Sequence, residues 1–402
     1  MVGVVESSAE EPMEMERSEV PSKAALKETV LLVQHSWPEV VNSDGETNET
    51  FFVAYREPGQ KSVFFDAKVN KKQPTFESPQ LKVEKLPYRA LGVHFPQLHG
   101  GLSKKFVAPF AEYDELHKGG VTSIEANNGN LMLSTDSTGA MLVWNSSTGE
   151  LLRSLEGHVL DVNVARFFPS GMVVLSGGMD MSLRIWSVEK GHCARVLTGH
   201  TAGIRDVEFI GVGAEVLSAA RDGTIRRWNC GTGECVETLN VSRRRQRERA
   251  PADRRRVASA RRDGRGNALR LGCQIRRRRS PSCRWDRRAR VSAPKEISPF
   301  VGTNGGKIQV VDLRQRTLVS TLDVNRGRVQ RVRALNGGVL ASFADGGVCF
   351  YPGPLNSAQS SLEMTGADCD PVYDFALADK YLFTACRDRI VRKYTVDSFF
   401  SP

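Results

Sequence analysis

The sequence lacks any apolar run of about 18 residues, so no transmembrane helix is expected. Its start also lacks a charged segment followed by an apolar stretch, which argues against a secretory signal peptide. Residues 1–21, beginning MVGVVESSAEEPMEMERSE, are acidic and poor in large apolar side chains, and we interpret them as a disordered tail. The sequence therefore favours a cytoplasmic protein, with the nucleus as a second compartment and no contact with membranes.

Metal and catalytic motifs are also missing. The eight cysteines have no CxxC spacing, which favours reduced, mostly buried thiols over a disulfide framework. The chain has no GxSxG, no HExxH, no motif of paired carboxylates and no histidine after His200. Residues 302–307 (GTNGGK) resemble a phosphate loop only superficially, because the lysine is not followed by Ser or Thr and the first glycine is misplaced. We expect no enzyme, no cofactor and no metal site.

Basic charge is concentrated in one segment. The chain of 402 residues carries a formal charge of +10, but the stretch from Arg243 to Arg290 alone holds 20 arginines, no lysine and four acids. That segment therefore contributes +16, and the other 354 residues together carry −6. The globular part is predicted to be mildly acidic, so a basic partner surface would be steered toward it and salt would weaken the complex.

The Arg-rich segment has few large aliphatic side chains and no alternating pattern, so residues 242–296 are expected to be disordered as written. Three interpretations remain open. The segment could be a nuclear-import or RNA-binding arginine tract, an extruded loop, or an error in the gene sequence such as a retained intron or a frame shift. Sequencing the transcript across this region distinguishes the third from the other two.

An internal repeat is the clearest positive signal. Three segments align and end on Asn145, Ser187 and Asn229, and their tryptophans, Trp144, Trp186 and Trp228, are each 42 residues apart. A Gly-His pair precedes two of them, with His158 and His200 each 28 residues before its tryptophan, while His117 lies 27 residues before the first. In phase over three copies, these features indicate a repeat protein.

The repeat resembles the WD40 family, in which each unit of about 40–45 residues forms one four-stranded blade of a β-propeller. An Asp six residues before the tryptophan closes a turn, and a buried His is expected to donate to it while a serine links His to the indole N–H. This structural role is favoured over metal ligation or base catalysis because the histidines follow the repeat. The network is expected to contain His158, Ser176, Asp180 and Trp186 in one copy, and His200, Ser218, Asp222 and Trp228 in the next.

The period continues in weaker form toward the C-terminus, where Val311, Tyr351 and Tyr394 occupy the position of the tryptophan. The gap of 83 residues between Trp228 and Val311 is almost two periods. We therefore predict an all-β chain folded as a seven-bladed WD40 β-propeller. Blades 1–3 are assigned to residues 113–241 and blades 5–7 to 297–402, and the fourth blade is disrupted by the Arg-rich segment.

Residues 22–112 lack the repeat signature but contain apolar, strand-like segments. They are interpreted as an N-terminal extension whose strands pack on the propeller and supply its closing strand, from residues 28–36 or 50–69. Trp37 is then expected in a hydrophobic core.

Several stretches resemble one WD40 subgroup, the proteasomal ATPase-associated factor family. The resemblance is carried by residues 155–187, 217–235, 365–394 and the sequence KKFVAPFAEYDELHKGGVTSI at 104–124. Its most specific parts are 167–171 (FFPSG) and the run from Thr365 to Tyr373. It implies a non-enzymatic assembly chaperone or regulator that binds ATPase subunits of the proteasome's regulatory particle and influences how that particle joins the proteolytic core.

Propellers often bind proteins at the rim of the central channel, and repeat phase places a set of polar and apolar residues there. The candidate partner-binding residues are Asp161, Asn163, Met179, Arg205, Arg221, Tyr373 and Arg387. Each could equally be a solvated turn residue. Two alternatives remain: an RNA-associated WD40 protein that uses the Arg-rich tract, so that nucleic acid is a partner only if this tract is real, and a generic WD40 scaffold or ubiquitin-ligase substrate receptor.

Overall fold

The computed structural model describes residues 26–42, 49–69, 72–98, 101–127, 129–240, 270–271, 300–312, 317–335, 338–353 and 359–396. Within these ranges the chain is almost entirely β-strand, and its single helix, α1, spans Trp37–Asn42. The all-β prediction is confirmed. Among the same residues no helix is long and apolar enough to cross a membrane. The predicted acidic tail and nearly all of the Arg-rich segment lie outside the described residues.

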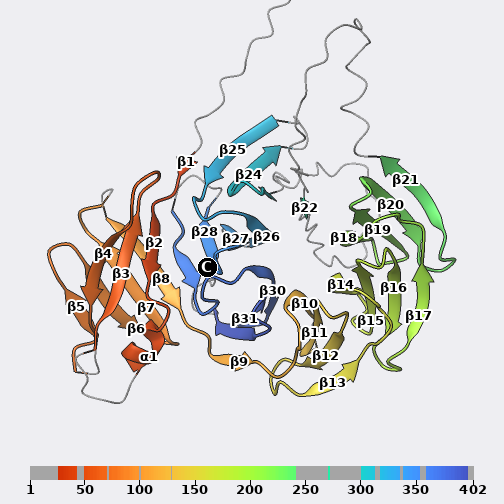
Figure 1. Cartoon of the computed structure of the whole chain (residues 1–402), viewed down its shortest axis with the longest axis horizontal. Coiled ribbons are helices and arrows are strands. Elements are labelled where there is room, and N and C mark those ends of the chain that lie inside the picture. Colours follow the sequence, from red (N-terminus) through yellow and green to blue (C-terminus); the bar gives the residue numbers. More distant parts are fainter. Residues whose placement is uncertain are drawn as a thin grey trace, which may run out of the picture.

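Six sheets are arranged around a common centre (Figure 1). The first three are regular antiparallel sheets in which neighbouring strands along the chain are neighbours in space. Their strands are β10 (Val121–Ala126), β11 (Leu131–Asp136), β12 (Met141–Asn145) and β13 (Leu151–Ser154); β14 (Val162–Phe167), β15 (Val173–Gly178), β16 (Leu183–Ser187) and β17 (Cys193–Leu197); and β18 (Ile204–Ile210), β19 (Glu215–Ala220), β20 (Thr224–Asn229) and β21 (Cys235–Asn240).

The other three central sheets take their outermost strand from the N-terminal part of the chain. Strands β1 (Leu26–Lys27), β8 (Leu102–Val107) and β9 (Ala111–Tyr113) pair with β25, β29 and β32, respectively. The C-terminal strands of these sheets are β22 (Arg270–Leu271), β23 (Phe300–Gly302), β24 (Lys307–Asp312) and β25 (Thr317–Asp323); β26 (Val329–Leu335), β27 (Gly338–Phe343), β28 (Val348–Pro352) and β29 (Leu362–Met364); and β30 (Val372–Ala378), β31 (Tyr381–Cys386) and β32 (Val391–Thr395).

All six repeat anchors lie on the third strand of their sheets. The three tryptophans are on β12, β16 and β20, Val311 is on β24, and Tyr351 and Tyr394 are on β28 and β32. The tryptophans and both tyrosines are at most 1% exposed. A large aromatic ring at this position fills the space between adjacent sheets, which explains why tyrosine replaces tryptophan in the last two copies.

The predicted fourth blade falls mostly outside the described residues, and the number of blades remains a prediction. The one described piece of it is β22, which pairs antiparallel with β23 through Arg270↔Gly302 and Leu271↔Val301. This piece is therefore the innermost strand of the sheet that continues through β23 to β25. The GTNGGK sequence forms the turn between β23 and β24, where Lys307 begins a strand and not a helix.

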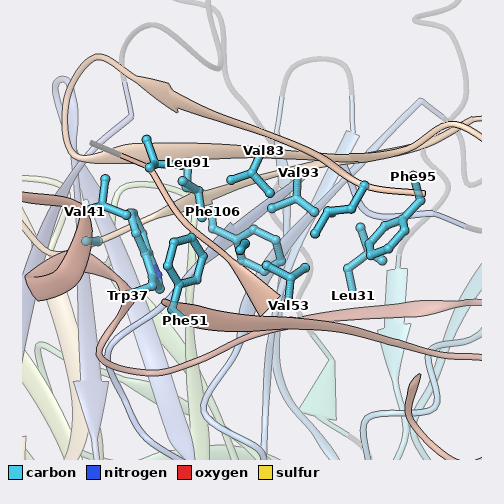
Figure 2. Close-up of a cluster of buried hydrophobic side chains, with 14 of the residues drawn as sticks. Leu31, Trp37, Val41, Phe51, Val53, Val83, Leu91, Val93, Phe95 and Phe106 are labelled. Atoms are coloured by element: carbon cyan, nitrogen blue, oxygen red, sulfur yellow. The ribbon is translucent and has the colours of Figure 1, made fainter. Parts of the chain in front are cut away.

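The N-terminal residues form a separate two-layered unit beside the central sheets (Figure 1). One layer is β2–β3–β4, and the other is β5–β6–β7–β8, which continues the sheet of β26–β29 across a parallel β8–β29 pair. Phe51 and Val53 of the first layer pack against Val83 and Leu91 of the second, together with Trp37 of α1 (Figure 2). The strands of this unit are β2 (Val30–Val33), β3 (Phe51–Arg56), β4 (Val63–Ala67), β5 (Thr75–Glu77), β6 (Lys82–Leu86), β7 (Ala90–Phe95) and β8 (Leu102–Val107). Strands β1 (Leu26–Lys27) and β9 (Ala111–Tyr113) belong to the central sheets.

The closing strand is not where the sequence placed it. Residues 28–36 and 50–69 do not complete the last central sheet; β9 (Ala111–Tyr113) does, pairing antiparallel with β32 through Val391↔Tyr113. The physical reason is that 28–36 and 50–69 bury their apolar side chains in their own two-layered core. The residues directly before β10 reach the neighbouring edge of β32 without a long connection. Trp37 is fully buried, as expected, and its indole Nε1 donates to Thr365 Oγ1 at 3.1 Å.

Candidate functional site

Two hydrogen-bonded networks join histidine, aspartate, serine and tryptophan in the second and third sheets. His158 Nδ1 lies 2.8 Å from Asp180 Oδ2, and its Nε2 lies 2.6 Å from Ser176 Oγ. The Trp186 indole donates to the same serine oxygen at 2.8 Å. The third sheet repeats this geometry. His200 Nδ1 lies 2.8 Å from Asp222 Oδ2, and His200 Nε2 lies 2.7 Å from Ser218 Oγ. The Trp228 indole donates to Ser218 Oγ at 2.8 Å. The structure thus brings together all eight residues that repeat phase assigned to the network.

The first sheet contains the same network, which sequence reasoning missed in part. His117 Nδ1 is 3.1 Å from Asp136 Oδ2, His117 Nε2 is 2.7 Å from Ser134 Oγ, and Trp144 donates to Ser134 at 3.0 Å. Asp136 was overlooked because it precedes its tryptophan by eight residues, whereas the other two aspartates precede theirs by six. The signal that could have found it is the serine, which lies ten residues before the tryptophan in all three copies.

The partners determine where the protons lie in these networks. A carboxylate only accepts, so His158 Nδ1–H donates to Asp180, and the Ser176 hydroxyl donates to His158 Nε2 while accepting from Trp186. Burial lowers the pKa of His158 and of His200, which keeps both rings neutral and suits this arrangement. The order Ser–His–Asp matches that of hydrolytic triads, but each serine oxygen is buried and already accepts an indole N–H. The networks therefore connect strands and have no reacting face.

The glycine of each Gly-His pair has a steric role. Gly199 has φ +149°, and a Cβ there would lie 2.7 Å from Arg226 Nη1 and 3.2 Å from the Trp228 ring. Gly157 has φ +151° and would meet Trp186 at 3.0 Å. Only glycine adopts this backbone freely and leaves room for the ring. The Gly-His pair thus positions the histidine by letting the backbone pass close over the tryptophan of the same sheet.

These networks predict loss of stability in acid. Burial opposes ionisation of Asp136, but hydrogen bonds from His117 and Thr138 outweigh it and lower the pKa from 3.8 to about 2. The folded state therefore binds fewer protons than the unfolded state, and this stabilisation, roughly 2 kcal/mol, is present above pH 3.8 and lost as pH falls toward 2. The lowered pKa values of His158 and His200 act in the same direction, beginning below their ordinary value of 6.5.

Urea midpoints measured between neutral and acidic pH check this prediction. We expect two steps of decreasing stability, one below 6.5 and one below 3.8. Asp136→Asn should flatten the lower step because the amide does not titrate. His192 is exposed, so His192→Gln should leave both steps unchanged. A midpoint independent of pH over this range would contradict the proton assignment.

A cluster of charged side chains fills the centre where the innermost strands meet. Arg166 Nη1 on β14 lies 3.1 Å from Glu125 Oε2 on β10 and 3.3 Å from Asp374 Oδ2 on β30. Arg331 on β26 contacts Asp374 at 3.3 Å and reaches Asp206 on β18 at 3.9 Å. Burial alone would lower the pKa of Arg166, but Asp374 and Glu125 outweigh it and raise the pKa. The cluster ties five sheets together, and sequence reasoning missed it.

Five of the seven predicted partner-binding residues lie on the second and third sheets. They are found where the inner strands β14 and β18 begin and where the second strands β15 and β19 end, and they are Asp161, Asn163, Met179, Arg205 and Arg221. Met179 N–H donates to the Asp161 carbonyl at 2.8 Å, and Arg221 N–H donates to the Gly203 carbonyl at 3.0 Å. A Cβ on Gly203 would meet Met179 Sδ at 2.7 Å. Asp161, Met179 and Arg221 therefore share one face of the molecule.

Two of these five residues, Asn163 and Arg205, are partly buried within the fold. Asn163 Nδ2 donates to the Ile204 carbonyl at 2.7 Å and so links β14 to β18. Arg205 is half-buried, and its Nε is a buried donor with no hydrogen-bond partner among the described residues. Asn163 thus has a structural contact, whereas Arg205 retains a donor that an acceptor from a partner could use after a side-chain movement.

Tyr373 and Arg387 lie on the last sheet, on the other side of β10 to β13. Arg387 is exposed and pairs with Asp370, with Nη2 2.6 Å from Oδ1. Tyr373 is half-buried beside Asp374 of the central cluster. The backbone of Arg387 lies against Gly120, where a Cβ would approach the Arg387 carbonyl oxygen to 2.9 Å. The two residues are therefore on the same face as the other five but separated from them by the first sheet.

The structure adds exposed apolar residues to this face. Val159 is 78% exposed, Leu160 52% and Met181 43%, and they lie in the loops that carry Asp161 and Met179. Exposed apolar side chains that gather in neighbouring loops mark interaction sites more often than single ones do. Sequence reasoning missed them because nothing in the repeat distinguishes an exposed loop valine from a buried one. We call Val159, Leu160, Met181 and the seven predicted residues the rim face.

Among the described residues no group of three or more His, Cys, Asp or Glu side chains could hold an ion. The six described cysteines are free thiols, and Cys235 and Cys369 are exposed, which departs from the expectation of mostly buried thiols. Both lie in surface positions, Cys235 at the start of the outer strand β21 and Cys369 in the loop before β30.

Comparison with known proteins agrees with the repeat geometry. A family model described as WD domain, G-beta repeat, matches residues 149–187 and 191–229. The first match extends from just before β13 to the end of β16, so one sequence repeat comprises the outer strand of one sheet and three strands of the next. Each repeat thus links two neighbouring sheets covalently.

Three curated relatives carry the name proteasomal ATPase-associated factor 1. The Bos taurus protein is 41% identical over 320 residues, which cover 73% of this chain and 80% of that protein. The Homo sapiens protein is 41% identical over 316 residues, 73% and 79% of the two chains. The Gallus gallus protein is 43% identical over 75 residues, 18% and 19% of the two chains. With this identity over most of both chains, the protein belongs to the proteasomal ATPase-associated factor 1 family of WD40-repeat proteins.

Proposed function

We propose that this protein is a non-catalytic binding factor that uses its rim face to bind an ATPase subunit of the proteasome's regulatory particle. The observation that carries the proposal is the 41% identity, over 73% of the chain, to relatives named for association with proteasomal ATPases. Through this contact the protein acts as an assembly chaperone or regulator, controlling how the regulatory particle joins the proteolytic core. The site of action is the cytoplasm, with the nucleus as a second compartment.

The rim face supports this proposal physically. It offers exposed apolar side chains, Val159 and Leu160, next to the exposed charges of Asp161 and Arg221. An apolar centre with a polar surround is typical of protein interfaces, in which a few anchors supply most of the binding energy. The three buried networks and the central charge cluster hold the loops of this face on a rigid frame.

Affinity capture tests the proposal. The tagged full chain is used as bait in a cell extract, and co-purifying chains are identified by mass spectrometry. We expect ATPase subunits of the regulatory particle, with recovery that falls as salt increases, because the chain outside residues 243–290 carries −6 and would attract a basic surface. Recovery of proteolytic-core subunits without any ATPase would contradict the proposal.

The alternative function rests on the 20 arginines between 243 and 290, which suit contact with an RNA backbone. An RNA-associated protein would lose its partners from the same capture after ribonuclease treatment. Replacing Arg276–Arg279 with glutamine would also reduce the steep dependence of RNA binding on salt. A capture that is unchanged by ribonuclease and retains the ATPases favours the first function.

A further inference from the structure

The N-terminal unit has a free strand edge far from the rim face. Strand β4 (Val63–Ala67) pairs with β3 on one side and with no other strand of the described chain. In Figure 1 the unit lies outside the ring of central sheets, with β3 and β4 on the side of β2 away from that ring. Free edges of this kind can pair with an extended segment of another chain.

Hydrogen bonds on the neighbouring strand show which backbone groups of β4 are free. Gln34 N–H donates to the Phe52 carbonyl at 2.9 Å, and Phe52 N–H donates to Gln34 Oε1 at 3.1 Å. The backbone N–H and C=O groups of Phe52 therefore point toward β2. Because the backbone N–H and C=O groups of successive residues in a strand point to opposite neighbouring strands, those of Phe51 and Val53 point toward β4. Their partners there are Ala67 and Phe65. The N–H and C=O groups of Phe64 and Asp66 therefore point away from β3, toward the open edge.

Apolar side chains surround this edge. Phe64 is 61% exposed, Val63 42% and Phe52 37%. The Phe52 and Phe64 rings meet edge-to-face with centroids 5.5 Å apart. Phe51 and Val53 belong to the buried core of the unit (Figure 2), and so does Ala67. The edge is thus a pre-ordered strand with an aromatic pair on its outer surface.

Length and charge indicate what kind of partner fits. Five residues extend over about 17 Å, whereas a stable interface between two proteins requires roughly 800 Å² from each partner, contributed by 20–30 residues. A second copy of this chain would pair too little surface here for a stable dimer. The exposed Lys61 and Lys68 flank the strand at its two ends, and Asp66 is the one acid within it. Such an edge suits a short peptide with carboxylates near its ends.

We propose that the free edge of β4 binds an extended peptide segment of a partner protein by strand addition, with an apolar side chain beside Phe64 and a carboxylate near Lys61 or Lys68. Main-chain hydrogen bonds to Phe64 and Asp66 supply affinity, and the aromatic pair supplies selectivity. This site is independent of the rim face and of any function proposed for it.

The test uses the full chain and a displayed library of random peptides roughly eight residues long, enough to span β4. Enriched peptides are labelled, and their affinity is measured by fluorescence anisotropy. Asp66→Pro removes a free N–H without removing a bond between β3 and β4, and Phe64→Thr removes the ring. Phe110→Thr is the matched control, because Phe110 is 59% exposed and lies on another part of the surface.

We expect enriched peptides to alternate apolar residues, to bind at least tenfold more weakly to Asp66→Pro and Phe64→Thr, and to bind Phe110→Thr like the original chain. The peptide should also slow hydrogen exchange at the amides of Phe64 and Asp66, a readout that survives if the proline variant does not fold. Equal affinity for all variants, or no enriched peptide, would overturn the proposal. A dimer of the original chain that Asp66→Pro converts to a monomer would also overturn it, because a second copy would then occupy the edge.

Discussion

Replacing Arg166 with methionine is expected to lower the free energy of unfolding by about 3–5 kcal/mol. The arginine is surrounded by Glu125 at 3.1 Å, Asp374 at 3.3 Å and Ser123 at 3.3 Å. Without the guanidinium, two carboxylates remain close together in the centre with one of their counter-charges removed. Removing one partner of a buried ion pair costs far more than the pair contributes in net stability, because the remaining charges lose compensation. Here Asp374 would keep Arg331, and Glu125 would keep Arg333, as an ion-pair partner.

Urea unfolding followed by tryptophan fluorescence measures this effect. Arg387→Met is the matched control, because the Arg387 side chain is 60% exposed and its pair with Asp370 should contribute less than about 1 kcal/mol. Adding Asp374→Asn to Arg166→Met should recover part of the lost free energy of unfolding, since it removes one of the two carboxylates that no longer contact the guanidinium. If Arg166→Met unfolds within about 1 kcal/mol of the original chain, the central cluster does not hold the sheets together.

Placing a charge in the apolar part of the rim face is expected to weaken ATPase binding about 100-fold. The variant is Val159→Glu combined with Met181→Glu, which changes side chains that are 78% and 43% exposed and should leave stability unaffected. An interface anchor contributes about 2 kcal/mol or more, so the loss of two anchors readily reaches the 2.7 kcal/mol that a 100-fold change represents. Titration of purified ATPase subunits with the two proteins measures the ratio of dissociation constants.

A control for that variant lies elsewhere on the same sheets. Val212 is 75% exposed in the loop between β18 and β19, at the end of β18 opposite the rim face, so Val212→Glu should not change binding. A second variant, Tyr373→Ala with Arg387→Glu, tests whether the interface extends across the first sheet to the last one. If Val212→Glu weakens binding as much as Val159→Glu with Met181→Glu, the interface is not on the rim face.

The repeat was predictable because its defining residues are spaced by the geometry they serve. Trp186 must lie between sheets, and His158 must reach both Ser176 and Asp180, so their spacing recurs wherever the same contacts recur. The network in the first sheet was harder to find, because Asp136 lies at the end of β11, two residues before the turn position that Asp180 and Asp222 occupy, although the turn has the same length in all three copies. Periodicity therefore locates buried contacts well but loses them when the same contact is made from another position of the repeat.

Contacts between distant segments were not predictable in the same way. Arg331 and Asp206 are 125 residues apart and meet only because β18 and β26 both line the centre. The closing strand was misplaced for a related reason: the sequence shows which segments are apolar, but not whether they pack on the propeller or on each other. Exposure of Val159 and Phe64 likewise depends on tertiary neighbours that no local pattern records.

We propose that this protein binds proteasomal ATPases through the rim face. The most direct measurement is a binding titration of the full chain with each purified ATPase subunit at low and at high salt, in parallel with Val159→Glu combined with Met181→Glu. We predict saturable binding to at least one subunit, weaker at high salt and about 100-fold weaker for the variant. Saturable binding that is identical for the variant and the original chain, or binding to none of the subunits, would contradict the claim.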